Sequence, residues 1–214
     1  MPCNSEQAMA TIKKKNDSTT EEKIIAAARK LFTQQGFNAV KTRDIAKESG
    51  INLALLNYYF RSKEKLFEMV MQENMQYFFS SVLNVVNDEE TSIKQKIERL
   101  VNTYLDMLAL NPELPLFVMS HLRNNVNPQR NQFQGRLKDS YFMKQIVEAI
   151  KRKEIAAIHP ANIVINIVAL SIFPYIGKPM LKNGHILNDA QFADLMEERR
   201  KLIPKWIEAM MQVK

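Results

Sequence analysis

Residues 42–63, TRDIAKESGINLALLNYYFRSK, decide the fold of this chain, because they have the pattern of two short helices joined by a tight turn. Ala46 is small where the helices pass closest, and Gly50 can adopt the left-handed conformation that ends the first helix. Asn52 is placed to cap the second helix. Apolar residues at helical spacing point into a shared core: Ile45, Ile51 and Leu56. The stretch predicts a helix-turn-helix, whose second helix, residues 53–60, would lie in a DNA major groove.

Composition and charge support this interpretation. The 214-residue chain has a formal net charge of +7, only 5 glycines, and long stretches of helix-forming residues without a series of alternating strands. Residues 11–65 hold 12 Lys and Arg against 6 Asp and Glu, a net +6, which leaves about +1 elsewhere. The sequence therefore predicts an all-α protein whose basic excess surrounds the helix-turn-helix, as expected for contact with phosphates.

Three features bear on the cellular compartment. The single cysteine, Cys3, lies in a polar N-terminal segment, so no disulfide can form within the chain. The N-terminus has no apolar segment typical of a signal peptide, which favours a cytoplasmic protein. The apolar stretch 163–176 is interrupted by Asn166, Ser171 and Pro174, so we expect a helix buried against another helix or subunit rather than a membrane span.

The chain divides into three predicted parts. Residues 1–18 form a polar, mobile arm; residues 19–66 form the helix-turn-helix domain, which continues into a connecting helix at 62–86; residues 87–214 form a helical body. Helix signals at the N-terminal ends are Thr19 with Glu22, Thr42, Asn52 and Ser62, and Gly36 ends the first helix. Pro- and Asn-containing breaks place the body helices at 92–110, 113–125, 129–153, 160–181 and 189–212.

The residues expected to contact DNA follow from their positions on these helices. Thr42 and Lys63 lie at helix N-termini, where a hydroxyl, an ammonium and free N–H groups can hold phosphate. Arg43 can reach phosphate or a base edge, and Tyr58 can anchor phosphate through its hydroxyl. For Asn52, capping and base contact are equally good explanations, whereas Tyr59 and Phe60 are better explained as core. The predicted DNA-contacting set is Thr42, Arg43, Asn52, Leu53, Ala54, Asn57, Tyr58 and Lys63.

The first third of the chain resembles the DNA-binding domain of the TetR family of bacterial transcriptional regulators. The resemblance rests on Thr42, Gly50, the Asn57–Phe60 segment NYYF and the Ser62–Glu64 segment SKE. It implies a repressor-like homodimer that binds a palindromic operator and responds to an effector. The family often has a polar or basic residue and a glycine early in the recognition helix. This chain has Leu53 and Ala54 there, which favours apolar contact, for example with thymine methyl groups.

The body should carry dimerisation, through the helix after Pro160 and the last helix. Apolar residues recur along the last helix at helical spacing, a pattern that usually marks core but also suits a four-helix interface between subunits. Trp206 is the best candidate for an interface anchor. The predicted dimer residues are Ile167, Leu170, Phe192, Met196, Ile203 and Trp206.

A ligand pocket in the body would lie between the long connecting helix and the three helices that follow. Its candidate lining is aromatic and methionine-rich with few charges, which favours a lipophilic or aromatic effector. Each of these residues, taken alone, is better explained as plain core. The candidates are Phe78, Tyr104, Met107, Leu108, Phe117, Met119, His121 and Phe142.

Two other classes of protein fit the sequence less well. A helical protein-interaction or scaffolding module with a vestigial DNA-binding head would not need the intact capping residues and basic charge of residues 42–65. An enzyme would need a phosphate loop, a nucleophile elbow, or a His and acid constellation, and the sequence contains none of these patterns. We therefore expect no catalytic residues, no metal site and no cofactor.

Overall fold

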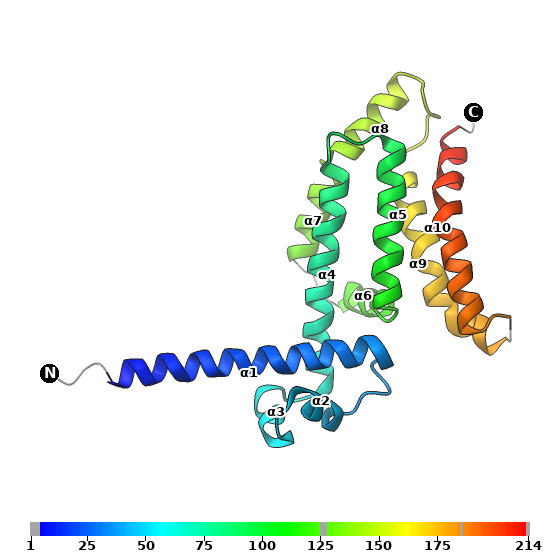
Figure 1. The fold of residues 1–214 in the computed structure, drawn as a ribbon. Coiled ribbons are helices and arrows are strands. Elements are labelled where there is room, and N and C mark those ends of the chain that lie inside the picture. The colour runs from blue at the N-terminus through cyan, green and yellow to red at the C-terminus, as the bar shows by residue number, and fades with distance from the viewer. Residues whose placement is uncertain (1–4, 125–127, 185, 213–214) are drawn as a thin grey trace. The chain divides into compact units, whose positions relative to one another are not determined.

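The computed structural model describes residues 5–124, 128–184 and 186–212. Within these ranges the chain forms ten α-helices and no strand, which confirms the predicted all-α class. It divides into two compact units, residues 1–75 and 76–214, and the boundary falls inside one long helix, α4 (Figure 1).

The N-terminal unit contains the helix-turn-helix. Its helices are α1 (Ser5–Gln35), α2 (Thr42–Ser49), α3 (Leu53–Tyr59) and the beginning of α4 (Lys63–Asn87). Gly50 ends α2 with φ 70°, and the Asn52 side chain caps α3 by accepting the N–H of Leu55 at 2.8 Å. Both local predictions are confirmed. Gly36 also adopts a positive φ of 76° directly after α1.

Two predicted helix starts in this unit are wrong. The first helix begins at Ser5 rather than at Thr19, because no proline or glycine interrupts residues 5–35. Most of the predicted N-terminal arm is therefore helical. Thr42 is the first residue of α2 rather than its cap, since Lys41 occupies the cap position and its N–H binds the Asp44 carboxylate at 3.0 Å.

The core of the N-terminal unit joins α1, α2, α3 and the first turns of α4. Its fully buried residues include Ile24, Ala28, Ile45, Leu56, Leu66 and Val70. Ile51, by contrast, is only half-buried. Three phenylalanine rings, Phe32, Phe37 and Phe67, pack in a cluster with centroids 4.7–6.0 Å apart. This core fixes the orientation of α3, whose outer face is left exposed.

The C-terminal unit consists of the rest of α4 and six further helices. These are α5 (Ile93–Leu110), α6 (Leu114–Asn124), α7 (Pro128–Lys138), α8 (Tyr141–Lys151), α9 (Ala161–Asn183) and α10 (Asp189–Met211). Helix α5 packs against α8, α9 and α10, and α9 packs against α10 (Figure 1). The predicted single helix over 129–153 is wrong, because Ser140 interrupts it and accepts the N–H of Met143 to cap α8.

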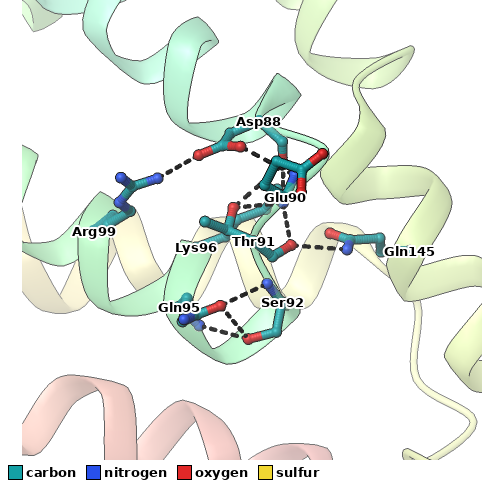
Figure 2. Close-up of polar contacts among 8 residues, drawn as sticks. All are labelled: Asp88, Glu90, Thr91, Ser92, Gln95, Lys96, Arg99 and Gln145. Carbon is teal, nitrogen blue, oxygen red and sulfur yellow. Dashed lines mark hydrogen bonds and ion pairs between the residues drawn. The ribbon is translucent and has the colours of Figure 1, made fainter.

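A buried lysine organises the turn between α4 and α5. Lys96 is fully buried, and its ammonium donates hydrogen bonds to the main-chain oxygens of Asp88 and Thr91 and, at 2.8 Å, to the Thr91 hydroxyl (Figure 2). The Asp88 carboxylate pairs with Arg99, which lowers the pKa of Asp88. Gln145 of α8 donates to the Thr91 carbonyl at 3.0 Å, so the same turn also holds α8.

Helix α9 carries the apolar stretch noted in the sequence. Neither Pro174 nor Pro179 ends it, and its segment Ala161–Lys182 is long and apolar enough to cross a membrane, with a mean hydropathy of 1.6. Ile163 and Ile167 are buried in the core that α9 shares with α5 and α10. Only 22% of the most apolar 18-residue segment of α9 is buried, however, so this helix also has an exposed apolar face.

Candidate nucleic-acid interface

The outer face of α3 is the candidate reading surface. Ala54, Asn57 and Tyr58 follow the i, i+3, i+4 spacing of one helix face and are all exposed, whereas Leu56 faces the core. Tyr58 is 79% exposed, and its ring packs edge-on against Tyr59 with centroids 5.3 Å apart. The neighbouring ring thus fixes the orientation of an exposed tyrosine. Leu53 is half-buried, and Phe60 is core, as predicted.

Among the described residues, several exposed cations without an ion-pair partner lie close to α2 and α3 along the chain. Lys41, Arg43, Lys47 and Arg61 have no ion-pair partner among the residues that the structure describes, and all four are exposed. Three other cations of the unit are paired with carboxylates: Arg29 with Glu73, Lys30 with Glu48, and Lys65 with Glu68. The basic excess of the N-terminal segment is therefore available around α2 and α3. Sequence reasoning missed Arg61, although its place directly after the recognition helix marks it.

Lys63 has a structural role that the sequence did not indicate. Its ammonium donates to the carbonyls of Phe37 at 2.9 Å and Val40 at 3.0 Å, and it lies 4.1 Å from the centre of the Phe37 ring. These contacts hold the loop between α1 and α2. Two of its three donors are engaged, so contact with phosphate at Lys63 would use the third. The Asn52 side chain caps α3 through its oxygen, as predicted. Contact of its amide N–H₂ with a base stays a prediction.

In the C-terminal unit, most of the predicted ligand-contacting residues belong to the hydrophobic core. Phe78, Leu108, Phe117 and Phe142 are buried, and Met107 packs against the core. Tyr104 packs edge-on against Phe78 at 4.8 Å, and burial raises the pKa of Tyr104. Met119 is 55% exposed, and its contact with a ligand stays a prediction. The side chain of His121 lies outside the described residues.

A small cavity of about 20 Å³ lies inside this core. Tyr104 and Phe142, two of the predicted residues, contribute to its lining, and Tyr104 is the only polar side chain among the residues that line it. The cavity has room for about one water molecule, so an effector of drug-like size would have to enlarge it.

Comparison with known proteins identifies the family of this helix-turn-helix unit. The model of the bacterial regulatory proteins of the tetR family matches residues 24–70, the segment that holds α2, α3 and the unpaired cations. The chain belongs to the TetR family of bacterial transcriptional regulators. As a TetR-family protein it is a DNA-binding transcriptional regulator and not an enzyme.

Relatives of this TetR-family regulator extend the match beyond the head. The probable HTH-type transcriptional regulator YttP of Bacillus subtilis is 26% identical over 163 residues, 74% of this chain and 78% of that protein. The nucleoid occlusion factor SlmA of Aliivibrio fischeri is 29% identical over 150 residues, 68% of this chain and 74% of its own. A TetR transcription regulator from Haloarcula marismortui has the same fold, with a TM-score of 0.61 and 18% identity over 91% of this chain and 100% of that one.

The predicted dimer residues of this regulator differ in burial. Four of the six are buried within the protomer and contribute to its core: Ile167, Phe192, Met196 and Ile203. Leu170 is half-buried and Trp206 is 40% exposed, so these two remain available. Sequence reasoning missed the exposed apolar side chains of α9, namely Ile165, Phe173 and Met180. Periodicity could not find them, because α9 is apolar on most sides.

Proposed function

We propose that this TetR-family regulator is a cytoplasmic homodimeric repressor that binds a palindromic operator and releases it when a small lipophilic effector binds the C-terminal unit. The observation that carries this proposal is the exposed face of α3, Ala54, Asn57 and Tyr58, flanked by cations that have no carboxylate partner among the described residues. Side chains on that face can contact base edges while Arg43 and Arg61 contact phosphates.

Release would follow from a shift between two populations. Two recognition helices fit successive half-sites only when they lie about 34–36 Å apart, one turn of the DNA helix. An effector that favours a dimer with a different separation needs a coupling free energy of only about 1–3 kcal/mol to act as a useful switch. The small cavity at Tyr104 and Phe142 lies in the core of the unit that would carry the effector.

The first test is selection of bound sequences from a random DNA pool by the purified protein at near-physiological salt. We expect enrichment of a palindrome whose half-site centres are one helical turn, or a multiple of it, apart. A folded protein that enriches no sequence would contradict the proposal and favour the scaffolding alternative. Enrichment of a single half-site without symmetry would contradict the dimer but would still support DNA binding by the N-terminal unit.

The proposed dimer interface is the exposed apolar face of α9 together with Trp206 of α10. Ile165, Phe173 and Met180 are 58–67% exposed on α9. The guanidinium of Arg199 lies 5.2 Å from the Trp206 ring and donates to the Leu170 carbonyl at 2.8 Å, so the tryptophan is already held in place. Large apolar side chains of this kind, fixed before binding, dominate the free energy of association.

The double substitution F173E/W206A should dissociate the dimer. Burying a glutamate at the centre of an apolar contact and removing an anchor should raise the dimer dissociation constant by at least about 100-fold, since hot-spot residues contribute about 2 kcal/mol or more each. Sedimentation equilibrium measures it. Tyr77→Glu, at an exposed position of α4, is the matched control and should remain dimeric. A dimer that survives F173E/W206A would show that another surface joins the subunits.

A further inference from the structure

A surface groove lies between α7, α8 and the start of α9. Its volume is about 630 Å³, and its floor is mainly apolar, with Leu137, Met143, Val147 and Val164 among the lining residues. Val147 is 38% exposed, whereas the other apolar side chains of α8 are buried or half-buried. A groove of this size matches the volume of sites that bind small molecules, about 300–1,000 Å³.

The charge at the rim of the groove is positive. Lys138 and Lys144 line it, both are exposed, and neither has an ion-pair partner within the described part of the chain. The one acidic lining residue, Glu148, is paired with Lys151 at 2.8 Å; this lowers the pKa of Glu148 and offsets part of its negative charge. His159 accepts the N–H of Ala161 through Nδ1, so a neutral ring presents Nε2–H as a donor. With two unpaired lysines against one paired carboxylate, the rim favours an anionic partner.

The groove adjoins the internal cavity. Leu137 and Val164 line both the groove and the small cavity beside Tyr104, so these two side chains lie between the two spaces. The helix that carries Leu137 is mostly polar in sequence. Its described apolar contacts with the core come from Leu137 and from Phe133, whose ring stacks on Phe79 with centroids 4.2 Å apart. A rotation of Leu137 would therefore connect the groove with the cavity while Phe133 keeps α7 in place.

We propose that this groove binds a single-tailed anionic amphiphile, such as a medium-chain carboxylate. The anionic head lies between Lys138 and Lys144, and the alkyl tail lies over Leu137 and Val147 and extends past Val164 toward Tyr104. Paired apolar and cationic surfaces select for a molecule that has both features, because a neutral oil leaves the ammonium groups uncompensated and a small anion leaves the apolar floor exposed. Binding in the groove is independent of the proposed function, but the role of this ligand as the effector rests on it.

The test uses the full-length protein and dodecanoate below its critical micelle concentration, with binding measured by isothermal titration calorimetry. We expect saturable binding, one molecule per chain, with a negative heat-capacity change from apolar burial. Dodecyltrimethylammonium has the same tail and the opposite charge, and should bind at least tenfold more weakly. Equal binding of the two amphiphiles, or no saturable binding of dodecanoate, would overturn the proposal.

Two variants locate the site. K138E/K144E should weaken dodecanoate at least tenfold and improve binding of the cationic amphiphile, whereas the charge-matched control K201E/K205E on α10 should bind as wild type. Leu137→Trp should block the path to the cavity and weaken dodecanoate binding without changing the preference for an anionic head. If both charge variants lose binding equally, the contact is a general attraction to a basic protein and the proposed site is wrong.

A parallel readout separates this inference from the proposed function. Dodecanoate is titrated into the complex of the protein with its selected operator, and release is followed by fluorescence anisotropy. Saturable binding without release would establish the site and contradict its role as the effector site. Operator selection that succeeds while dodecanoate fails to bind would leave the DNA-binding function intact and reject the anionic amphiphile.

Discussion

Replacing Arg43 and Tyr58 with alanine is expected to reduce operator affinity by at least about 10³-fold at near-physiological salt, because a dimer loses four contacts of about 1–3 kcal/mol each. Both side chains are exposed, and Arg43 has no carboxylate partner among the described residues that would compete with DNA. Tyr58 is 79% exposed and its ring is held by Tyr59, so it loses little conformational freedom on contact with DNA. Neither residue contributes to the core, and the fold should be unaffected.

The salt dependence distinguishes the two side chains. Arg43 neutralises a phosphate, so Arg43→Ala should reduce the slope of log K against log salt by about 2 for a dimer, one for each subunit. Tyr58→Ala should weaken binding without changing this slope, because the hydroxyl carries no charge. Electrophoretic mobility shifts at several salt concentrations measure both effects.

Arg29→Ala is the matched control for the loss of one positive charge. Arg29 is exposed on α1 and already paired with Glu73, so its removal should change operator affinity by less than about threefold. If R43A/Y58A binds the selected operator as tightly as wild type, the assignment of α2 and α3 as the reading surface is wrong.

The helix-turn-helix could be predicted because its signals are local. The left-handed backbone conformation after α2 requires a residue such as Gly50, and the free N–H groups at the start of α3 require a capping residue such as Asn52. Both requirements depend only on residues a few positions away. The exposed positions Ala54, Asn57 and Tyr58 follow from the helical period once Leu56 is assigned to the core. Sequence reasoning therefore placed this surface without knowledge of the tertiary structure.

The contacts that the sequence did not indicate include one between distant segments. Lys63 was assigned to phosphate from its place at a helix start, but its ammonium reaches back to the carbonyls of Phe37 and Val40. A long flexible side chain can reach many partners, and only the fold determines which one is near. Similarly, the break at Ser140 is weak in sequence because no proline or glycine marks it.

The dimer residues show a second limit of sequence patterns. Helix α10 has a clear apolar stripe, and the structure uses most of it for the core of the protomer, where Phe192, Met196 and Ile203 are buried. In α9, apolar residues occupy several faces, so their period cannot distinguish Ile167, which is core, from Phe173, which is exposed. Which face is covered depends on the neighbouring helices, and the sequence pattern carries no information on them.

Lys96→Ala should destabilise the C-terminal unit by about 3–4 kcal/mol and lower its Tm by about 10 °C, the largest stability effect expected from a single polar substitution. The ammonium donates to the main-chain oxygens of Asp88 and Thr91 and to the Thr91 hydroxyl (Figure 2). Alanine leaves these buried acceptors without their donor and also removes the alkyl stem that fills the space beneath the turn. Thermal unfolding followed by circular dichroism measures the change.

Two variants separate the polar contribution of Lys96 from other effects. Lys94→Ala, two residues earlier on α5, removes an exposed ion pair with Glu208 and should change stability by less than about 1 kcal/mol. Lys96→Met keeps most of the stem but not the donors, and should remain within about 1 kcal/mol of Lys96→Ala if the hydrogen bonds dominate. A Lys96→Ala protein no less stable than Lys94→Ala would show that the turn holds without its lysine. Because Gln145 of α8 donates to the Thr91 carbonyl, loss of Lys96 should also loosen α8, which hydrogen exchange of the α8 amides would detect.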